Sequence, residues 1–435
     1  MKIGIIGAGN IGGGGFMVAH LKNGKNITID FREMAPSKAS RDMYLDSFGN
    51  PLMHLSQDGH LACGVPGTIA GLFAAMKYAK LPFKTLIQPA IDLAEKGFAI
   101  TAHQVNDLNE LKKEFLELNL SPVAFVKQQP WKLGDTLVQK ELANTLKRIR
   151  DFGAKDFYEG ETAKLIVAEM QKGKGIISMA DLKNYTAKDR TPMEFDYKGY
   201  HIVTMPLPSS GGIILEQVLK MIENKNIGAM KFQTPASVQL LTEAERRAYA
   251  DRAQFLGDAD FVKVPVATLV SDKYLTQRMA DYVPNKAGSS TATKAGNIKE
   301  SEETTHLSIL DKEGNAVSVT TTLNGSYGSR TVVSGAGFLL NNQMDDFSVK
   351  PGVPNMYGAV GAEANSIAPG KRMLSSMSPA IRRVPFAIWP NALSSTPRLR
   401  CSPSTRNTGR PPPDAGTLMA LGCWIWNSAM VAPQS

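Results

Sequence analysis

The stretch TTHLSILDKEGNAVSVTTTLN, which runs from Thr304 to Asn324, decides the fold. Apolar and polar residues alternate on both sides of Gly314 and Asn315, and a period of two around such a pair is typical of a β-hairpin. The segment GFLLNN at 337–342 continues the pattern as a further strand. We therefore expect an antiparallel meander from residue 305 onward.

The sequence before this hairpin favours helices. Apolar residues recur there at intervals of three and four, and Gly153 and Gly257 are placed to end two of the helices. Helices are predicted at 67–80, 86–98, 105–118, 140–153, 162–173, 213–224 and 236–257, a strand at 197–205, and a linker at 286–301. Helices before and hairpins after predict a layered α+β domain.

The composition of the 435 residues, 43% hydrophobic and 20% charged, is that of a globular chain with a sizeable core. The net charge is +9, but basic residues are interspersed with acidic ones, which argues against a nucleic-acid partner. Cys63, Cys401 and Cys423 lack metal-ligand spacing, so we expect no metal site. No apolar stretch of about 18 residues predicts a membrane span.

The glycine-rich start offers a competing interpretation. Gly7, Gly9 and Gly12 match the dinucleotide-binding pattern GxGxxG after an apolar start, and Asp30 follows about twenty residues later. Residues 1–32 then predict a strand, a glycine turn, a short helix and a second strand at 27–31. However, no further alternation of strand and helix follows to complete a doubly wound sheet. A dinucleotide-dependent oxidoreductase is the weaker hypothesis.

Thr304 follows the linker and begins a strand, which suits a chain that cleaves itself. Its hydroxyl would attack the carbonyl of Glu303, and an N-to-O acyl shift followed by hydrolysis would leave a free amine beside Thr304 Oγ. That amine, with an ordinary pKa of about 8, could serve as the base without a cofactor. Taken alone, threonine is simply a good strand residue, and His306, on the same face, is more often a packing residue than a catalyst.

Several longer motifs narrow the interpretation. AGNIGGGGFM, IDFREMAP, GVPGTIAG, QPAIDLAEKGF, MPLPSSGGI, AYADRAQFLGDADFV, TTHLSILDKEGNAVSVTTTLN, LLNNQMDDFSVKPGVPN and LSSMSPAI occur in this order. In these motifs the chain resembles the γ-glutamyltranspeptidases from about Ala8 to Ile381. The resemblance implies a four-layer αββα N-terminal-nucleophile hydrolase sandwich and cleavage between Glu303 and Thr304. The regions 1–303 and 304–381 would then be the large and small subunits of a heterodimer.

The resemblance also implies the roles of individual residues. Thr304 would be the nucleophile and Thr322 its hydrogen-bonding partner. Arg32 would bind the α-carboxylate of a γ-glutamyl donor such as glutathione, with water or an amino acid or peptide as acceptor. Further carboxylate contacts are implied for Ser375 and Ser376, ammonium contacts for Asn324, Gln343 and Asp346, and a gating position in the lid loop 351–363 for Tyr357. An arginine offers planar paired donors to a carboxylate, and an aspartate is the strongest acceptor for an ammonium.

Both ends depart from the family pattern. The paired glycines of a PGG-type motif, whose N–H groups would hold the oxyanion, are replaced by SSTPRLR. This replacement falls within the Pro- and Arg-rich tail 382–435, whose composition indicates a disordered segment, a translation in the wrong frame or a chimeric end. The start MKIGII lacks an export signal, although the resemblance implies a periplasmic or extracellular protein. We therefore expect a fold incomplete at both ends, and a catalytically impaired relic is the alternative hypothesis.

Overall fold

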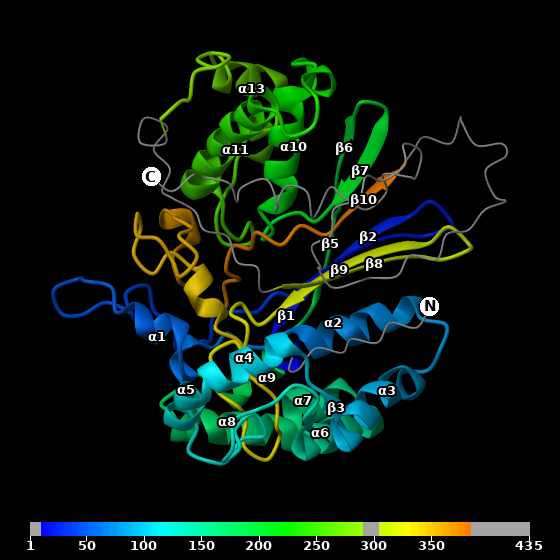
Figure 1. Ribbon diagram of the computed structural model, residues 1–435, viewed down its shortest axis with the longest axis vertical. Coiled ribbons are helices and arrows are strands. Elements are labelled where there is room, and N and C mark those ends of the chain that lie inside the picture. The colour runs from blue at the N-terminus through cyan, green and yellow to red at the C-terminus, as the bar shows by residue number, and fades with distance from the viewer. Residues whose placement is uncertain (1–9, 290–303, 384–435) are drawn as a thin grey trace.

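The predicted hairpin forms one edge of the larger of two principal sheets in the computed structural model, which describes residues 10–289 and 304–383 (Figure 1). Strands β8 (Thr304–Leu310) and β9 (Ala316–Thr322) pair antiparallel, so the hairpin is confirmed. Gly314 takes a φ of 85° in the connecting turn, in the left-handed region that glycine tolerates. This register places Thr304 directly opposite Thr322.

The larger sheet has five antiparallel strands in the order β5-β2-β1-β9-β8. Its other strands are β1 (Gly14–His20), β2 (Asn26–Asp30) and β5 (Lys188–Arg190). The strand predicted at 27–31 is therefore confirmed as β2. Because β1 pairs with β9, the regions before and after residue 303 share one sheet.

The short helix predicted after the glycine run is wrong, since those residues form β1. The cause is a long-range approach that local sequence does not reveal. A Cβ atom on Gly13 would lie 2.1 Å from the carbonyl oxygen of Thr322, and one on Gly15 would lie 2.2 Å from that of Thr320. The glycines let β1 run tight against β9, where a side chain would not fit.

The second sheet has three strands in the order β10-β7-β6. They are β6 (Met193–Tyr197), β7 (Tyr200–Thr204) and β10 (Ala380–Arg383). The strand predicted at 197–205 is confirmed over Tyr200–Thr204, but its start is wrong, because Lys198 and Gly199, at φ 45° and 79°, turn the chain from β6 into β7. The strand predicted at 337–342 is also wrong, since that segment contributes only an isolated bridge between Val332 and Leu339.

Helices are the main regular structure of the described region 10–289. The seven predicted helices are present, with the one at 105–118 divided into α4 and α5. Their bounds, with those of the two short remaining strands, are α1 (Met53–Gln57), α2 (Thr68–Ala75), α3 (Phe83–Lys96), β3 (Phe98–Ala99), α4 (Ala102–Glu110), α5 (Lys112–Leu118), β4 (Thr136–Leu137), α6 (Lys140–Phe152), α7 (Ala154–Glu159), α8 (Glu161–Lys172), α9 (Met179–Asn184), α10 (Gly211–Glu223), α11 (Pro235–Phe255), α12 (Val266–Leu269) and α13 (Asp272–Arg278). Within the described residues, no helix is long and apolar enough to cross a membrane.

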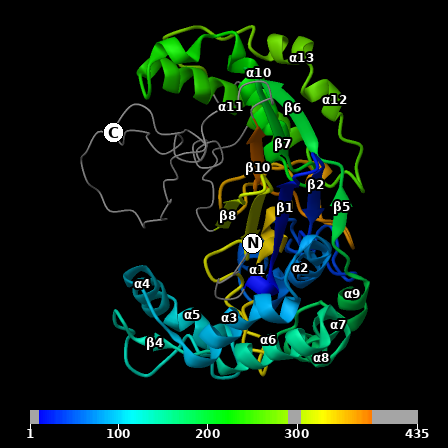
Figure 2. The same cartoon turned by 90° about the vertical axis from the view of Figure 1, so that its right-hand side faces the viewer.

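The elements stack as helix, sheet, sheet, helix (Figures 1 and 2). On one face of β1, Phe16 and Val18 pack against the second sheet, and on the other face Met17 and Ala19 pack toward α2. The outer face of the second sheet is covered by α10 and α11. This layering confirms the predicted αββα sandwich and brings the ends of β1, β2 and β9 together near the middle of the molecule.

Candidate active site

Thr304 begins β8 at the edge of the larger sheet, and its strand partner Thr322 is buried. The Oγ1 atom of Thr322 accepts a hydrogen bond from the backbone N–H of Asn324 at 2.9 Å. This contact fixes the Thr322 hydroxyl at the point where β9 ends. Glu303, on the other side of the predicted cleavage point, lies outside the described residues.

Arg32 follows the end of β2 and is fully buried. Its Nη2 atom donates to the Asp346 carboxylate, and its Nε atom donates to the carbonyl oxygen of Met373 at 3.3 Å. Its Nη1 atom has no hydrogen-bond partner. A buried guanidinium with one unused nitrogen retains donor capacity that an anionic ligand could take.

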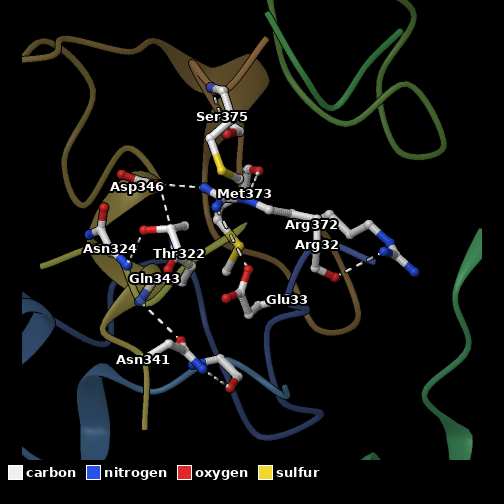
Figure 3. A network of polar contacts seen from close by, with 12 residues as sticks. Arg32, Glu33, Thr322, Asn324, Asn341, Gln343, Asp346, Arg372, Met373 and Ser375 are labelled. Atoms are coloured by element: carbon white, nitrogen blue, oxygen red, sulfur yellow. Dashed lines mark hydrogen bonds and ion pairs between the residues drawn. The ribbon is translucent and has the colours of Figure 1, made fainter. Parts of the chain in front are cut away.

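Asp346 lies across from Arg32 at the end of the 3-10 helix Gln343–Asp346 (Figure 3). Besides Arg32, its carboxylate accepts hydrogen bonds from Gln343 Nε2 at 3.2 Å and Asn355 Nδ2 at 3.4 Å. The Oε1 atom of Gln343 is buried without a hydrogen-bond partner. Asp346 is 16% exposed, so a small cation could still reach it.

Asn324 and Tyr357 connect this group to the loop predicted as a lid. Asn324 holds a φ of 78°, a left-handed conformation that asparagine tolerates better than most residues. Its side-chain amide donates to the carbonyl oxygen of Asn342 at 3.1 Å. The Tyr357 hydroxyl donates to the carbonyl oxygen of Asn324 at 2.8 Å, so the loop is closed onto the end of β9.

Ser375 and Ser376 approach from the segment before β10. Ser375 is buried, and its Oγ atom accepts from the backbone N–H of Met377 at 3.1 Å. Its backbone N–H donates to the carbonyl oxygen of Pro208 at 2.9 Å. Ser376 Oγ instead accepts from Arg252 Nη2 at 3.2 Å. The two neighbouring serines therefore meet different surroundings.

Glu33 is a charged residue of this site that the sequence analysis did not assign. It lies beside Arg32, with Oε2 3.7 Å from Arg32 Nη1, is fully buried, and has no hydrogen bond to either carboxylate oxygen (Figure 3). Burial raises its pKa to about 7, and this effect outweighs the attraction of Arg32. The only feature of the sequence that could have indicated Glu33 is its position directly after Arg32 in a largely apolar stretch.

His306 does not pair with Thr304. Its Nδ1 contacts Thr320 Oγ1 at 2.8 Å and its Nε2 contacts Ser308 Oγ at 3.0 Å. Burial lowers the pKa of His306, which favours a neutral ring. The imidazole is held by strand hydroxyls, an arrangement that suits a supporting residue.

The dinucleotide hypothesis is wrong for this fold. Gly7 and Gly9 lie outside the described residues, but Gly12 leads into a strand rather than into a helix N-terminus. That strand pairs antiparallel with β2, whereas the dinucleotide-binding motif requires parallel strands. Asp30 is engaged by Arg372 and Arg190 instead of facing a ribose.

The arrangement places a buried cation and a carboxylate in contact near two strand hydroxyls. Such a pair of opposite charges can hold a ligand that carries both a carboxylate and an ammonium group. Nowhere in 10–289 or 304–383 do three or more His, Cys, Asp or Glu side chains gather in a way that could hold a metal ion.

Comparisons with known proteins show which sequences this chain is similar to. The family described as Gamma-glutamyltranspeptidase matches residues 6–383. The glutathione hydrolase proenzyme of Escherichia coli (strain K12) is 48% identical over 380 residues, which cover 86% of this chain and 65% of that protein. The chain thus spans about 65% of the length of that relative.

Two solved structures show the same fold. The crystal structure of Helicobacter pylori gamma-glutamyltranspeptidase is 45% identical with a TM-score of 0.63, covering 65% of this chain and 81% of that one. The cephalosporin acylase from Bacillus halodurans is 22% identical with a TM-score of 0.71, covering 86% of this chain and 67% of that one, and supports the fold alone.

Proposed function

The chain belongs to the γ-glutamyltranspeptidase family, and we propose that it hydrolyses or transfers the γ-glutamyl group of glutathione and related compounds. In this proposal, cleavage between Glu303 and Thr304 releases the amine of Thr304, and Thr304 then forms a γ-glutamyl ester. Because strands from both sides of the cleavage point share one sheet, the two fragments would remain together as a heterodimer.

The contact between Arg32 and Asp346 is the observation that carries the proposal. A γ-glutamyl donor presents an α-carboxylate and an α-ammonium on one carbon atom. A buried guanidinium and a carboxylate in direct contact offer the two complementary charges side by side. On binding, the donor would separate this ion pair. Its α-carboxylate would then bind Arg32, and its α-ammonium would bind Asp346.

The proposed reaction uses groups of the chain, the donor, and water or an acceptor amine. The Oγ atom of Thr304 attacks the γ-carbonyl carbon, and the Thr304 amine takes the hydroxyl proton. The amide C–N bond then breaks, and the leaving amine receives that proton. Water or an acceptor amine next attacks the ester, which releases glutamate or a new γ-glutamyl amide and restores the hydroxyl. Thr322 would steady the nucleophile from the opposite strand.

A non-catalytic γ-glutamyl binder is the second candidate. Residues 394–400, SSTPRLR, replace the glycine pair that would stabilise the oxyanion, and they lie outside the described residues. An oxyanion donor is worth about 3 kcal/mol, so its loss alone would slow turnover by a factor of roughly a hundred or more. Such a chain would still bind glutamate through Arg32 and Asp346.

Purification and a donor assay separate the two candidates. Two fragments on a denaturing gel, the smaller beginning at Thr304, together with p-nitroaniline release from γ-glutamyl-p-nitroanilide, would support the enzyme. A single uncut chain that binds L-glutamate without turnover would support the binder. A chain that neither cuts itself nor binds L-glutamate would overturn both.

A location outside the cytoplasm, which the family resemblance implies, stays part of the proposal.

A further inference from the structure

Arg372 is a fully buried arginine to which the sequence analysis gave no role. Arg372 precedes Ser375 in the chain, and its side chain extends toward Arg32 at the end of β2 (Figure 3). Nη1 donates to Asp30 Oδ1 at 2.8 Å and to the carbonyl oxygen of Arg32 at 2.9 Å. Nη2 donates to the carbonyl oxygen of Thr186 at 2.7 Å.

These contacts hold the main chain of Arg32 from both sides. The Arg32 N–H donates to Asp30 Oδ1 at 3.0 Å, the same oxygen atom that accepts from Arg372. The Arg32 carbonyl accepts from Arg372 and also from the Tyr185 hydroxyl, at 2.7 Å. In addition, the Arg32 guanidinium donates to the carbonyl oxygen of Met373, the residue that follows Arg372. Moving Arg372 would therefore disturb Arg32 at both its backbone and its side chain.

We propose that Arg372 and Asp30 are positioning residues that hold Arg32 where it recognises the α-carboxylate of the ligand. Neither residue needs to touch the ligand. The inference rests on the proposed function, because it assigns a purpose to the placement of Arg32. A small displacement matters here, since paired hydrogen bonds between guanidinium and carboxylate require both groups to be aligned.

Arg190 provides a matched control within the same network. Its Nη2 and Nε atoms donate to the other oxygen of Asp30, Oδ2, at 3.0 and 3.1 Å. It is largely buried, with 14% of its side chain exposed, and the remaining hydrogen bonds of its guanidinium go to Asp260. Replacing Arg190 thus removes an ion pair from the same carboxylate without removing a contact to Arg32.

Three ligands test the positioning role by titration calorimetry on the full chain. L-Glutamate carries both α groups, 4-aminobutyrate lacks the α-carboxylate, and glutarate lacks the α-ammonium. In Arg372→Gln, the preference for L-glutamate over 4-aminobutyrate should fall at least about tenfold, because the charge-assisted contact to Arg32 is weakened. The preference over glutarate, which depends on Asp346, should change less. Arg190→Gln should keep both preferences.

The controls keep each outcome decisive. If Arg372→Gln does not fold, as its circular dichroism would show, Arg372→Lys keeps the charge but cannot reach all the acceptors, and the same loss of preference is expected. Unchanged preferences in a folded Arg372 variant, or an equal loss in Arg190→Gln, would overturn the positioning role and leave the proposed function standing. A wild-type chain that does not prefer L-glutamate over 4-aminobutyrate would overturn the proposed function itself.

Discussion

Replacing Glu33 with glutamine should make the stability of the protein less dependent on pH. The ordinary glutamate pKa of 4.5 rises to about 7 for Glu33 because burial disfavours the charged carboxylate. The folded state therefore holds this proton more tightly than the unfolded state. The resulting stabilisation is fully present below pH 4.5 and is lost as the pH rises toward about 7. Since a tenfold change in an acid constant is worth about 1.4 kcal/mol, the loss should be about 3 kcal/mol.

Urea unfolding at pH values between 4.5 and 7 measures this loss. The comparison must be between wild type and Glu33→Gln, because burial also raises the pKa of Asp345, to about 6, in both proteins. The glutamine is neutral throughout, so the difference in unfolding free energy between the proteins should change by about 3 kcal/mol across this range. Glu110→Gln, at an exposed position of α4, is the matched control. A constant difference between wild type and Glu33→Gln would refute the reasoning.

The remaining predictions concern the nucleophile, the ammonium contact and the glycine strand. Thr304→Ala should abolish self-cleavage and donor turnover, whereas His306→Ala should keep part of both; equal loss on gels and in rate assays would favour a histidine-based mechanism. Asp346→Asn should raise the KM for γ-glutamyl-p-nitroanilide at least about tenfold, through loss of a charged acceptor, and an unchanged KM would remove Asp346 from the site. Gly15→Ala should destabilise the fold by about 1–3 kcal/mol in urea unfolding, because a Cβ atom there would lie 2.2 Å from the Thr320 carbonyl oxygen; unchanged stability would show that β1 can move away from β9.

The sequence predicted correctly those helices and strands whose conformation depends on residues close by in the chain. The hairpin at Gly314 follows from alternation around a turn, and the helix at 140–153 follows from its apolar period and the glycine at its end. The glycine run was predicted wrongly because its conformation depends on β9, which lies about three hundred residues further along the chain. The β6–β7 hairpin at 193–204 was missed because its two-residue turn lies within an otherwise continuous alternation.

The site shows a similar division. The family resemblance supplied Arg32 and Asp346, and the structure brings them into contact, although their roles with a ligand remain predictions. Glu33 and Arg372 escaped the sequence analysis because their importance lies in burial and in partners far along the chain. No period or spacing in a single sequence indicates which charged residues will be enclosed by the fold.

The boundaries of the two predicted subunit regions, after residues 303 and 381, stay predictions. Strands β8 and β9 lie in the same sheet as β1 and β2, so the two predicted subunit regions are parts of one packed body. Strand β10 extends through Arg383, two residues into the predicted tail 382–435. The remainder of that tail lies outside the described residues.

Peptide mapping by mass spectrometry, after turnover has been stopped in acid, tests whether Thr304 carries the γ-glutamyl group. The purified chain would be mixed with γ-glutamyl-p-nitroanilide, stopped in acid and digested. We expect a peptide whose first residue is Thr304 and which carries a γ-glutamyl ester on that threonine. Turnover accompanied by a γ-glutamyl group on any other residue, or by an uncut bond between Glu303 and Thr304, would contradict it.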